Sequence, residues 1–145
     1  MSPAEELRVA ADLRAMDRVR GFLKKILRDV AMNEEDSFKI ELSLHEICIN
    51  IALYAYPGRT GEIILRAWRD EETVRFEFRD TGVAFDPRPV RPPDIMEKLR
   101  TGGRGGFGIY LFRTLMDGFE YRRESGQNIL LVYKNLRPAG PSRSV

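Results

Sequence analysis

The sequence predicts an α/β protein of two layers, in which a mixed, mostly antiparallel sheet carries helices on one face. Residues 62–69 and 73–79 have the apolar and alternating patterns of two strands, joined by a short acidic turn. Between residues 13 and 56, apolar residues recur at intervals of three and four, which is typical of helices. A second hairpin is expected over 119–136, turned at Ser125-Gly126. Antiparallel pairs with helices gathered on one side predict a two-layer sandwich.

The first third of the chain predicts an edge strand and two helices. Residues 5–10 alternate weakly, and Asp12 can then cap a helix. A half-buried helix follows, with apolar positions at Met16, Val19, Leu23, Ile26, Leu27 and Val30. Asn33 can cap a second helix, which is expected to run to about Tyr56 and to end at Pro57-Gly58.

The second helix is unusually apolar, so we expect it to be largely buried. Its apolar residues cover more than one face: Phe38, Ile40, Leu42, Leu44, Ile47, Ile49, Ile51 and Leu53. Polar groups among such neighbours need a reason, which draws attention to Glu46 and Asn50. Four residues apart on a helix means about 40° apart around it, so both side chains are expected in one cleft. The alternative is a polar pair on a solvated face.

Asp80 is the most informative single residue. The strand over 73–79 places Val74, Phe76 and Phe78 on one face, and the same period turns Asp80 toward the core. A buried carboxylate without a partner costs several kcal/mol. We therefore expect either a protein donor or a ligand to meet it.

A proline-rich segment and a glycine-rich run follow. Residues 87–104 carry four prolines and a short predicted helix at 94–99, and a further helix is expected over 107–116. The run from Gly103 to Gly108 matches GxGxxG, but no strand directly precedes it, so it is not a Rossmann fingerprint. Neither a P-loop nor the HRD and DFG elements of protein kinases are present. Glycines that open a helix can still present N–H groups to an anion, whereas a flexible linker is the alternative.

Composition limits the remaining classes. With 145 residues and 43% hydrophobic content, we expect one domain over 1–136 and a disordered tail over 137–145. A net charge of +2 gives no reason to expect nucleic acid as a partner. No apolar run suits a membrane span or a signal peptide, so a cytoplasmic location is expected. The lone Cys48 predicts a buried structural thiol, and the lone His45 leaves no zinc site built on several histidines.

Three ordered boxes together resemble the Bergerat (GHKL, histidine-kinase-like) ATP-binding fold. They are Glu46-Ile47-Cys48-Ile49-Asn50 with Ala55-Tyr56, Asp80-Thr81-Gly82 with Phe85-Asp86-Pro87, and Gly106-Phe107-Gly108 leading to Leu115-Met116-Asp117. Within that fold, the chain resembles bacterial anti-sigma factor serine/threonine kinases of partner-switching systems, over about residues 5–136. It departs from them at Ala84, where a second glycine is usual, and at Tyr54, where histidine is common.

The resemblance implies a kinase that uses ATP and magnesium. Such a protein binds a sigma factor or a similar regulator, phosphorylates a STAS-domain antagonist on serine, and often forms a homodimer. Glu46 would be the catalytic base, Asn50 the magnesium ligand and Asp80 the acceptor for the adenine amino group. The implied nucleotide site comprises Asn50, Asp80, Gly82, Ala84, Phe85, Arg104, Gly105, Gly106, Phe107 and Gly108. The alternatives are a non-catalytic, nucleotide-dependent binding module and an autonomous ATPase or histidine kinase core.

Overall fold

A computed structural model describes residues 4–84 and 115–136. The proline-rich segment, the short helix expected at 94–99, the glycine-rich run, most of the helix expected at 107–116 and the tail therefore lie outside the described residues.

Five strands form one sheet in the order β1-β2-β3-β5-β4. Their bounds are β1 Glu5–Ala10, β2 Glu62–Arg69, β3 Thr73–Asp80, β4 Gly118–Glu124 and β5 Gln127–Asn135. All four pairings between these described strands are antiparallel, which agrees with the predicted mostly antiparallel sheet. Both hairpins are confirmed. The second turns at Ser125 and Gly126, whose φ angles of 52° and 78° give the left-handed conformation that a two-residue hairpin turn needs.

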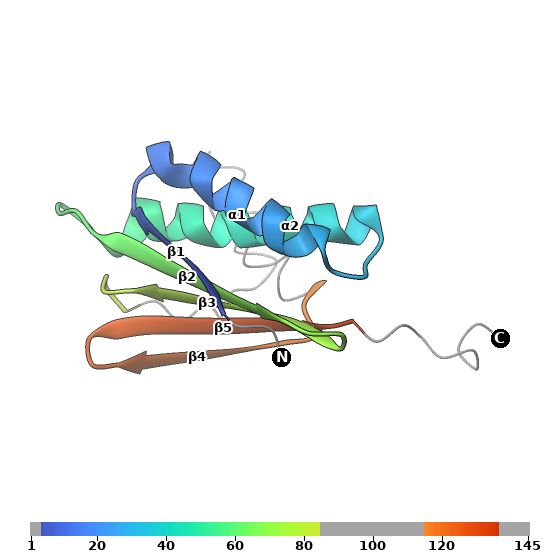
Figure 1. The fold of residues 1–145 in the computed structure, drawn as a ribbon. Coiled ribbons are helices and arrows are strands. Elements are labelled where there is room, and N and C mark those ends of the chain that lie inside the picture. Colours follow the sequence, from blue (N-terminus) through green and yellow to red (C-terminus); the bar gives the residue numbers. More distant parts are fainter. Residues whose placement is uncertain (1–3, 85–114, 137–145) are drawn as a thin grey trace, which may run out of the picture.

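Helices α1 (Met16–Arg28) and α2 (Glu34–Asn50) lie side by side on one face of the sheet (Figure 1), which confirms the two-layer architecture. Both predicted caps form. The Asp12 carboxylate accepts from the Arg14 N–H at 2.9 Å, ahead of a short 3-10 turn (Leu13–Ala15), and the Asn33 side chain accepts from the Asp36 N–H at 2.7 Å. The α2 helix continues as a π-helical turn, η2 (Ile51–Ala55). Such turns occur frequently at functional sites.

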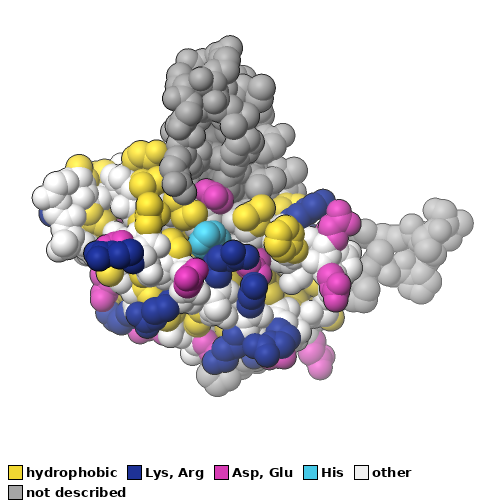
Figure 2. Space-filling model, turned by 90° about the horizontal axis from the view of Figure 1, so that it is seen from above, with side chains coloured by type: hydrophobic (Ala, Val, Ile, Leu, Met, Phe, Trp, Pro, Cys, Tyr) yellow, Lys and Arg dark blue, Asp and Glu magenta, His cyan; other side chains and the backbone are white. Residues whose placement is uncertain are grey.

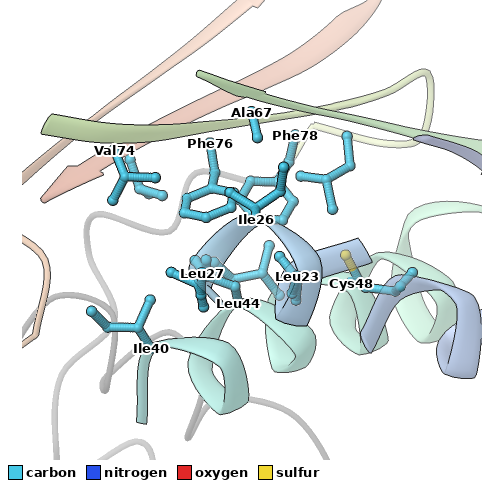
Figure 3. Close-up of a cluster of buried hydrophobic side chains, with 14 of the residues drawn as sticks. Leu23, Ile26, Leu27, Ile40, Leu44, Cys48, Ala67, Val74, Phe76 and Phe78 are labelled. Carbon is cyan, nitrogen blue, oxygen red and sulfur yellow. The ribbon is translucent and has the colours of Figure 1, made fainter. Parts of the chain in front are cut away.

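The core lies between the helices and the inner face of the sheet (Figure 3). Val74, Phe76 and Phe78 of β3 are fully buried there, as their alternation predicted. They pack with residues of both helices, among them Leu23, Ile26, Leu27, Ile40, Leu44 and Cys48. The predicted buried thiol at Cys48 is therefore confirmed.

The prediction that α2 is largely buried does not hold for all of its apolar residues. Phe38 is 58% exposed and Leu42 is 38% exposed, whereas Ile40 and Leu44 are buried. Two residues along a helix correspond to a rotation of about 200°, so the two pairs face opposite sides. Figure 2 views this helix layer from above and shows hydrophobic side chains among the charged ones. No helix among the described residues is long and apolar enough to cross a membrane.

Candidate nucleotide-binding site

A cavity of about 120 Å³ lies between the end of α2 and the inner face of the sheet. Its helix side consists of Ile47, Asn50, Ile51, Tyr54 and Ala55. Its sheet side consists of Phe78, Asp80, Tyr121, Asn128 and Leu130, with Val83 and Ala84 from the loop after β3. An apolar cavity of roughly 150 Å³ admits a benzene ring, so this one suits a flat ring. Apolar walls with a few polar groups are typical of small-molecule sites.

Asp80 lies in the wall of this cavity and is only 6% exposed, which confirms its predicted inward orientation. Its Oδ1 atom accepts two hydrogen bonds at 2.9 Å, one from the Gly82 N–H and one from Asn128 Nδ2. No hydrogen bond from the described residues reaches Oδ2. Burial raises the pKa of the Asp80 carboxyl above its usual range, and the two donors and the charge of Arg123 oppose that rise. The carboxylate thus has a protein donor on one oxygen and faces the cavity.

The turn after Asp80 is fixed by the end of the second helix. The Val83 N–H donates to the Ala55 carbonyl at 2.8 Å. Gly82 lies so close to this carbonyl that an added Cβ would be 2.3 Å from the oxygen. A residue with a side chain cannot occupy this position without moving backbone, so a glycine is required here by close approach.

Tyr56 and Arg59 hold the same turn from its other side. The Tyr56 hydroxyl accepts from the Thr81 N–H at 2.9 Å and donates to the Glu62 carbonyl at 2.6 Å. Arg59 donates to the Thr81 carbonyl at 2.9 Å, and its guanidinium lies over the Tyr56 ring, 5.0 Å from the centroid. The Asp80 turn is therefore braced by the residues that follow α2.

Ala84 lies in the cavity wall. The family that the chain resembles usually has glycine at this position. Among the described residues, Ser125 is the only non-glycine residue with a positive φ. The backbone at position 84 is therefore compatible with alanine, and the substitution places a methyl group at the wall without backbone strain.

The structure places Asn50 in the cavity wall but not Glu46. Asn50 is 9% exposed, and its Nδ2 atom is buried with no hydrogen-bond partner among the described groups. Glu46 is half-buried one turn earlier and is not among the described residues that line the cavity. The helix residues that line the cavity form one stripe along the helix surface: Ile47, Asn50, Ile51 and Tyr54. This stripe is centred between Asn50 and Ile51, and Glu46 lies at its edge.

Three site residues were missed by the sequence interpretation. Asn128 and Tyr121 line the cavity, and Arg123 donates to the Gly82 carbonyl at 2.8 Å. A signal for Asn128 was present, because it continues the inward phase of Leu130 and Val132 in the same way that Asp80 continues that of Phe78.

The remaining predicted site residues, Phe85, Arg104, Gly105, Gly106, Phe107 and Gly108, lie outside the described residues. In the part of the chain that the structure describes, no group of three or more His, Cys, Asp or Glu side chains could hold a metal ion.

Comparison with known families identifies the fold. The model of the protein family described as "Histidine kinase-like ATPase domain" matches residues 9–134, which is nearly the whole chain. The chain belongs to this family. The sequence-based assignment to the histidine-kinase-like ATP-binding fold is thus confirmed.

Two bacterial relatives of this ATPase-domain chain are each named serine-protein kinase RsbW. One is from a strain of Bacillus cereus and one from Bacillus thuringiensis subsp. konkukian. Each is 26% identical over 131 residues, covering 88% of this chain and 82% of the relative.

Two solved structures share the fold of this ATPase-domain chain. One contains the RsbU and RsbW domains of a Mycobacterium tuberculosis protein, with a TM-score of 0.65 and 18% identity. That match covers 95% of this chain but only 34% of the solved chain, so this chain spans about a third of it. The other is the Acinetobacter baumannii histidine kinase AdeS, with a TM-score of 0.51, 12% identity, and coverage of 91% and 68%.

Proposed function

We propose that this chain is a serine protein kinase and anti-sigma factor. It binds ATP with magnesium, sequesters a sigma factor or a similar regulator, and phosphorylates a STAS-domain antagonist on serine. Membership of the ATPase-domain family and the relatives named serine-protein kinase support this proposal. A phosphoserine carries about −1.5 to −2 charges, so its formation weakens the complex with the antagonist and leaves the kinase available to the regulator.

The observation that carries the proposal is Asp80 in the wall of a ring-sized, mainly apolar cavity. Its Oδ2 atom is the acceptor for the C6 amino group of adenine, and the apolar residues on either side cover the faces of the ring. A site organised around such a hydrogen bond strongly rejects rings that lack the donor.

Asn50 is the proposed magnesium ligand. Its buried amide nitrogen has no partner among the described groups, and this donor suits an acceptor on the bound nucleotide, whereas the ion would bind the amide oxygen. An amide oxygen is a ligand type that magnesium accepts, and magnesium usually combines one or two protein ligands with substrate phosphates and water. When bound, the ion would neutralise charge on the phosphates.

Glu46 is the proposed base that orients or deprotonates the attacking serine hydroxyl. Its position at the edge of the cavity stripe favours a second candidate function, a nucleotide-dependent binding module that sequesters its partner without phosphoryl transfer. The two candidates share the nucleotide site and differ only in chemistry at Glu46.

The two candidates are separated by incubating the chain with labelled ATP, magnesium and a STAS-domain antagonist from the same genome. Phosphate on an antagonist serine, identified by mass spectrometry, supports the kinase. Complex formation that depends on ATP but leaves the antagonist unmodified supports the binding module. Transfer to histidine, or hydrolysis alone, contradicts both.

Two substitutions test the proposed roles of Asp80 and Glu46. Asp80→Asn removes the acceptor and should weaken ATP binding by roughly 10- to 150-fold, because a hydrogen bond to a charged group is worth about 1.5–3 kcal/mol. Unchanged affinity would show that Asp80 does not contact the base. Glu46→Gln should abolish transfer while ATP still binds. Glu35→Gln is the matched control, since Glu35 is an exposed residue of the same helix that pairs with Lys39 at 3.1 Å.

A homodimer stays a prediction, and we propose the outer face of the sheet as its contact surface. Arg75, Glu77 and Arg79 lie there, with Glu77 and Arg79 joined by an ion pair of 2.7 Å. Charge reversal at Arg75 combined with measurement of molar mass in solution tests this contact.

A further inference from the structure

Asn128 uses both ends of its side-chain amide to hold the Asp80 turn. Its Nδ2 atom donates to Asp80 Oδ1 at 2.9 Å and to the Val83 carbonyl at 2.8 Å. Its Oδ1 atom accepts from the Tyr121 hydroxyl at 2.5 Å and from Arg123 Nη1 at 3.1 Å. With 5% exposure, the amide is buried and held at each polar atom.

The consequence for Asp80 is that one of its two oxygens is already occupied. A carboxylate oxygen has about two lone-pair directions, and the Gly82 N–H and Asn128 Nδ2 take both at Oδ1. Among the described residues, nothing donates to Oδ2. The cavity is therefore presented with a single acceptor atom rather than with a whole carboxylate.

We propose that Asn128 sets the base preference of the site by occupying Oδ1 of Asp80, which favours adenine over guanine. This inference rests on the proposed nucleotide-binding function. Adenine offers one amino donor beside a ring-nitrogen acceptor, so a single oxygen satisfies its donor. Guanine offers two parallel donors, N1–H and the C2 amino group, which match a carboxylate with both oxygens free. With Oδ1 occupied, one guanine donor is buried without a partner, and that is costly.

Arg123 contacts Asp80 only indirectly, through Asn128 and through the Asp80 turn. Its Nη1 atom reaches both Asn128 Oδ1 and the Gly82 carbonyl, so it links strand β4 to the two groups that hold Asp80. Its side chain is exposed enough to be replaced without opening the core. Arg123 is therefore a positioning residue, and its loss should loosen the Asn128 amide without removing it.

Asn128 also keeps Asp80 in the ionised form that accepts a hydrogen bond. The groups that face Asp80 are Asn128 and the Gly82 N–H, with the positive charge of Arg123 nearby, and all three lower the pKa of the carboxyl that burial raises. Removal of the Asn128 donor raises that pKa further. ATP binding should then fail at a higher pH in the variant than in the wild type, which is an effect that a general loss of packing would not produce.

The test measures dissociation constants for ATP and GTP with magnesium, across pH 5.5–8, in the wild type and in Asn128→Leu. Leucine has the same branching and the same number of side-chain heavy atoms as asparagine, but it is somewhat larger and has no donor. We expect the preference for ATP over GTP to fall by about tenfold or more and the midpoint of the pH dependence to rise. An unchanged ATP:GTP ratio in a folded variant that binds ATP would refute the inference. A wild type that binds neither nucleotide would instead refute the proposed function, and the inference with it.

Arg123→Met decides the question if Asn128→Leu does not fold. We expect it to shift the ATP:GTP ratio in the same direction by about twofold to fivefold. The matched control is Arg122→Met, since Arg122 is the neighbouring exposed residue and pairs with Glu124 at 2.9 Å. Equal ratios in the two arginine variants would overturn the role of the amide, whereas a shift confined to Arg123→Met supports it.

Discussion

A substitution at Gly82 tests directly how the Asp80 turn is held in place. A Cβ at this position would lie 2.3 Å from the Ala55 carbonyl oxygen, 2.5 Å from the Ala55 Cβ and 2.7 Å from the Ala55 carbonyl carbon. Two of these three atoms belong to the backbone at the end of a helix, which cannot rotate away as a flexible side chain can. Gly82→Ala must therefore push the turn outward by roughly 1 Å to reach ordinary contact.

The expected cost follows from the contacts that this shift breaks. Overpacking in a buried site costs about 1–3 kcal/mol. Two hydrogen bonds are at risk, from the Val83 N–H to Ala55 and from the Gly82 N–H to Asp80, and a typical bond contributes about 0.5–1.5 kcal/mol. We expect a loss of about 2–4 kcal/mol in the free energy of unfolding, or roughly 6–14 °C in Tm for a chain of this length. Because Asp80 loses one of its two donors, ATP affinity should fall by at least about tenfold.

Thermal unfolding and ATP titration of Gly82→Ala give both numbers. Gly21→Ala is the matched control, because a Cβ at Gly21 meets nothing within 4 Å and the residue lies inside helix α1. Alanine there should stabilise the protein by about 1 kcal/mol. Wild-type stability and affinity in Gly82→Ala would show that the turn does not depend on this close approach.

Three further predictions concern the core and the helix layer. Burial raises the pKa of the Cys48 thiol, so a thiol reagent at pH 8 should react only after unfolding, as absorbance shows. Burial and the charge of Arg20 lower the pKa of His45, so the unfolded chain binds a proton at this histidine before the folded protein does as the pH falls. The free energy of unfolding should therefore be at its full value above about pH 6.5 and decrease below it. In denaturant titrations, His45→Asn should make that decrease smaller. Phe38→Ser should change the free energy of unfolding by less than about 0.5 kcal/mol, whereas Leu44→Ala should lower it by about 2–5 kcal/mol.

Much of the fold could be predicted because its signals are local. Alternation in 73–79 gave the correct faces of β3, and Asp12 and Asn33 form the caps that their positions suggested. The exposure of Phe38 and Leu42 could not be predicted, because a helix that is apolar on several faces does not show which face meets the sheet. The pairings of β1 with β2 and of β3 with β5 join segments that are distant in the sequence, and periodicity alone does not record which distant segments meet.

The candidate site also contains residues that local sequence patterns predicted and residues that only strand pairing brings together. Asp80 was found because the period of one strand carries it inward. Glu46 and Asn50 were expected in one cleft on the basis of their spacing, yet an offset of about 40° is enough to leave only Asn50 in the wall of a narrow cavity. The contacts of Asn128, Tyr121 and Arg123 with the turn required the pairing of β3 with β5, which brings Asp80 opposite Asn128. Sequence spacing thus identified the groups, and the sheet register decided which of them meet.

The way Asp80 is held explains why a buried carboxylate is tolerated here. Its turn is fixed from the helix end through Ala55 and Tyr56, and from the last hairpin through Asn128 and Arg123. These contacts lower the cost of burial at Oδ1 only, because Oδ2 has no donor among the described residues. Within the described part of the chain, part of the desolvation cost of Asp80 is therefore not offset, and in the proposed site a ligand with a single donor would offset it on binding. In the proposed nucleotide site, the same incomplete solvation that makes Asp80 a poor contributor to stability would make it a selective contact for a base.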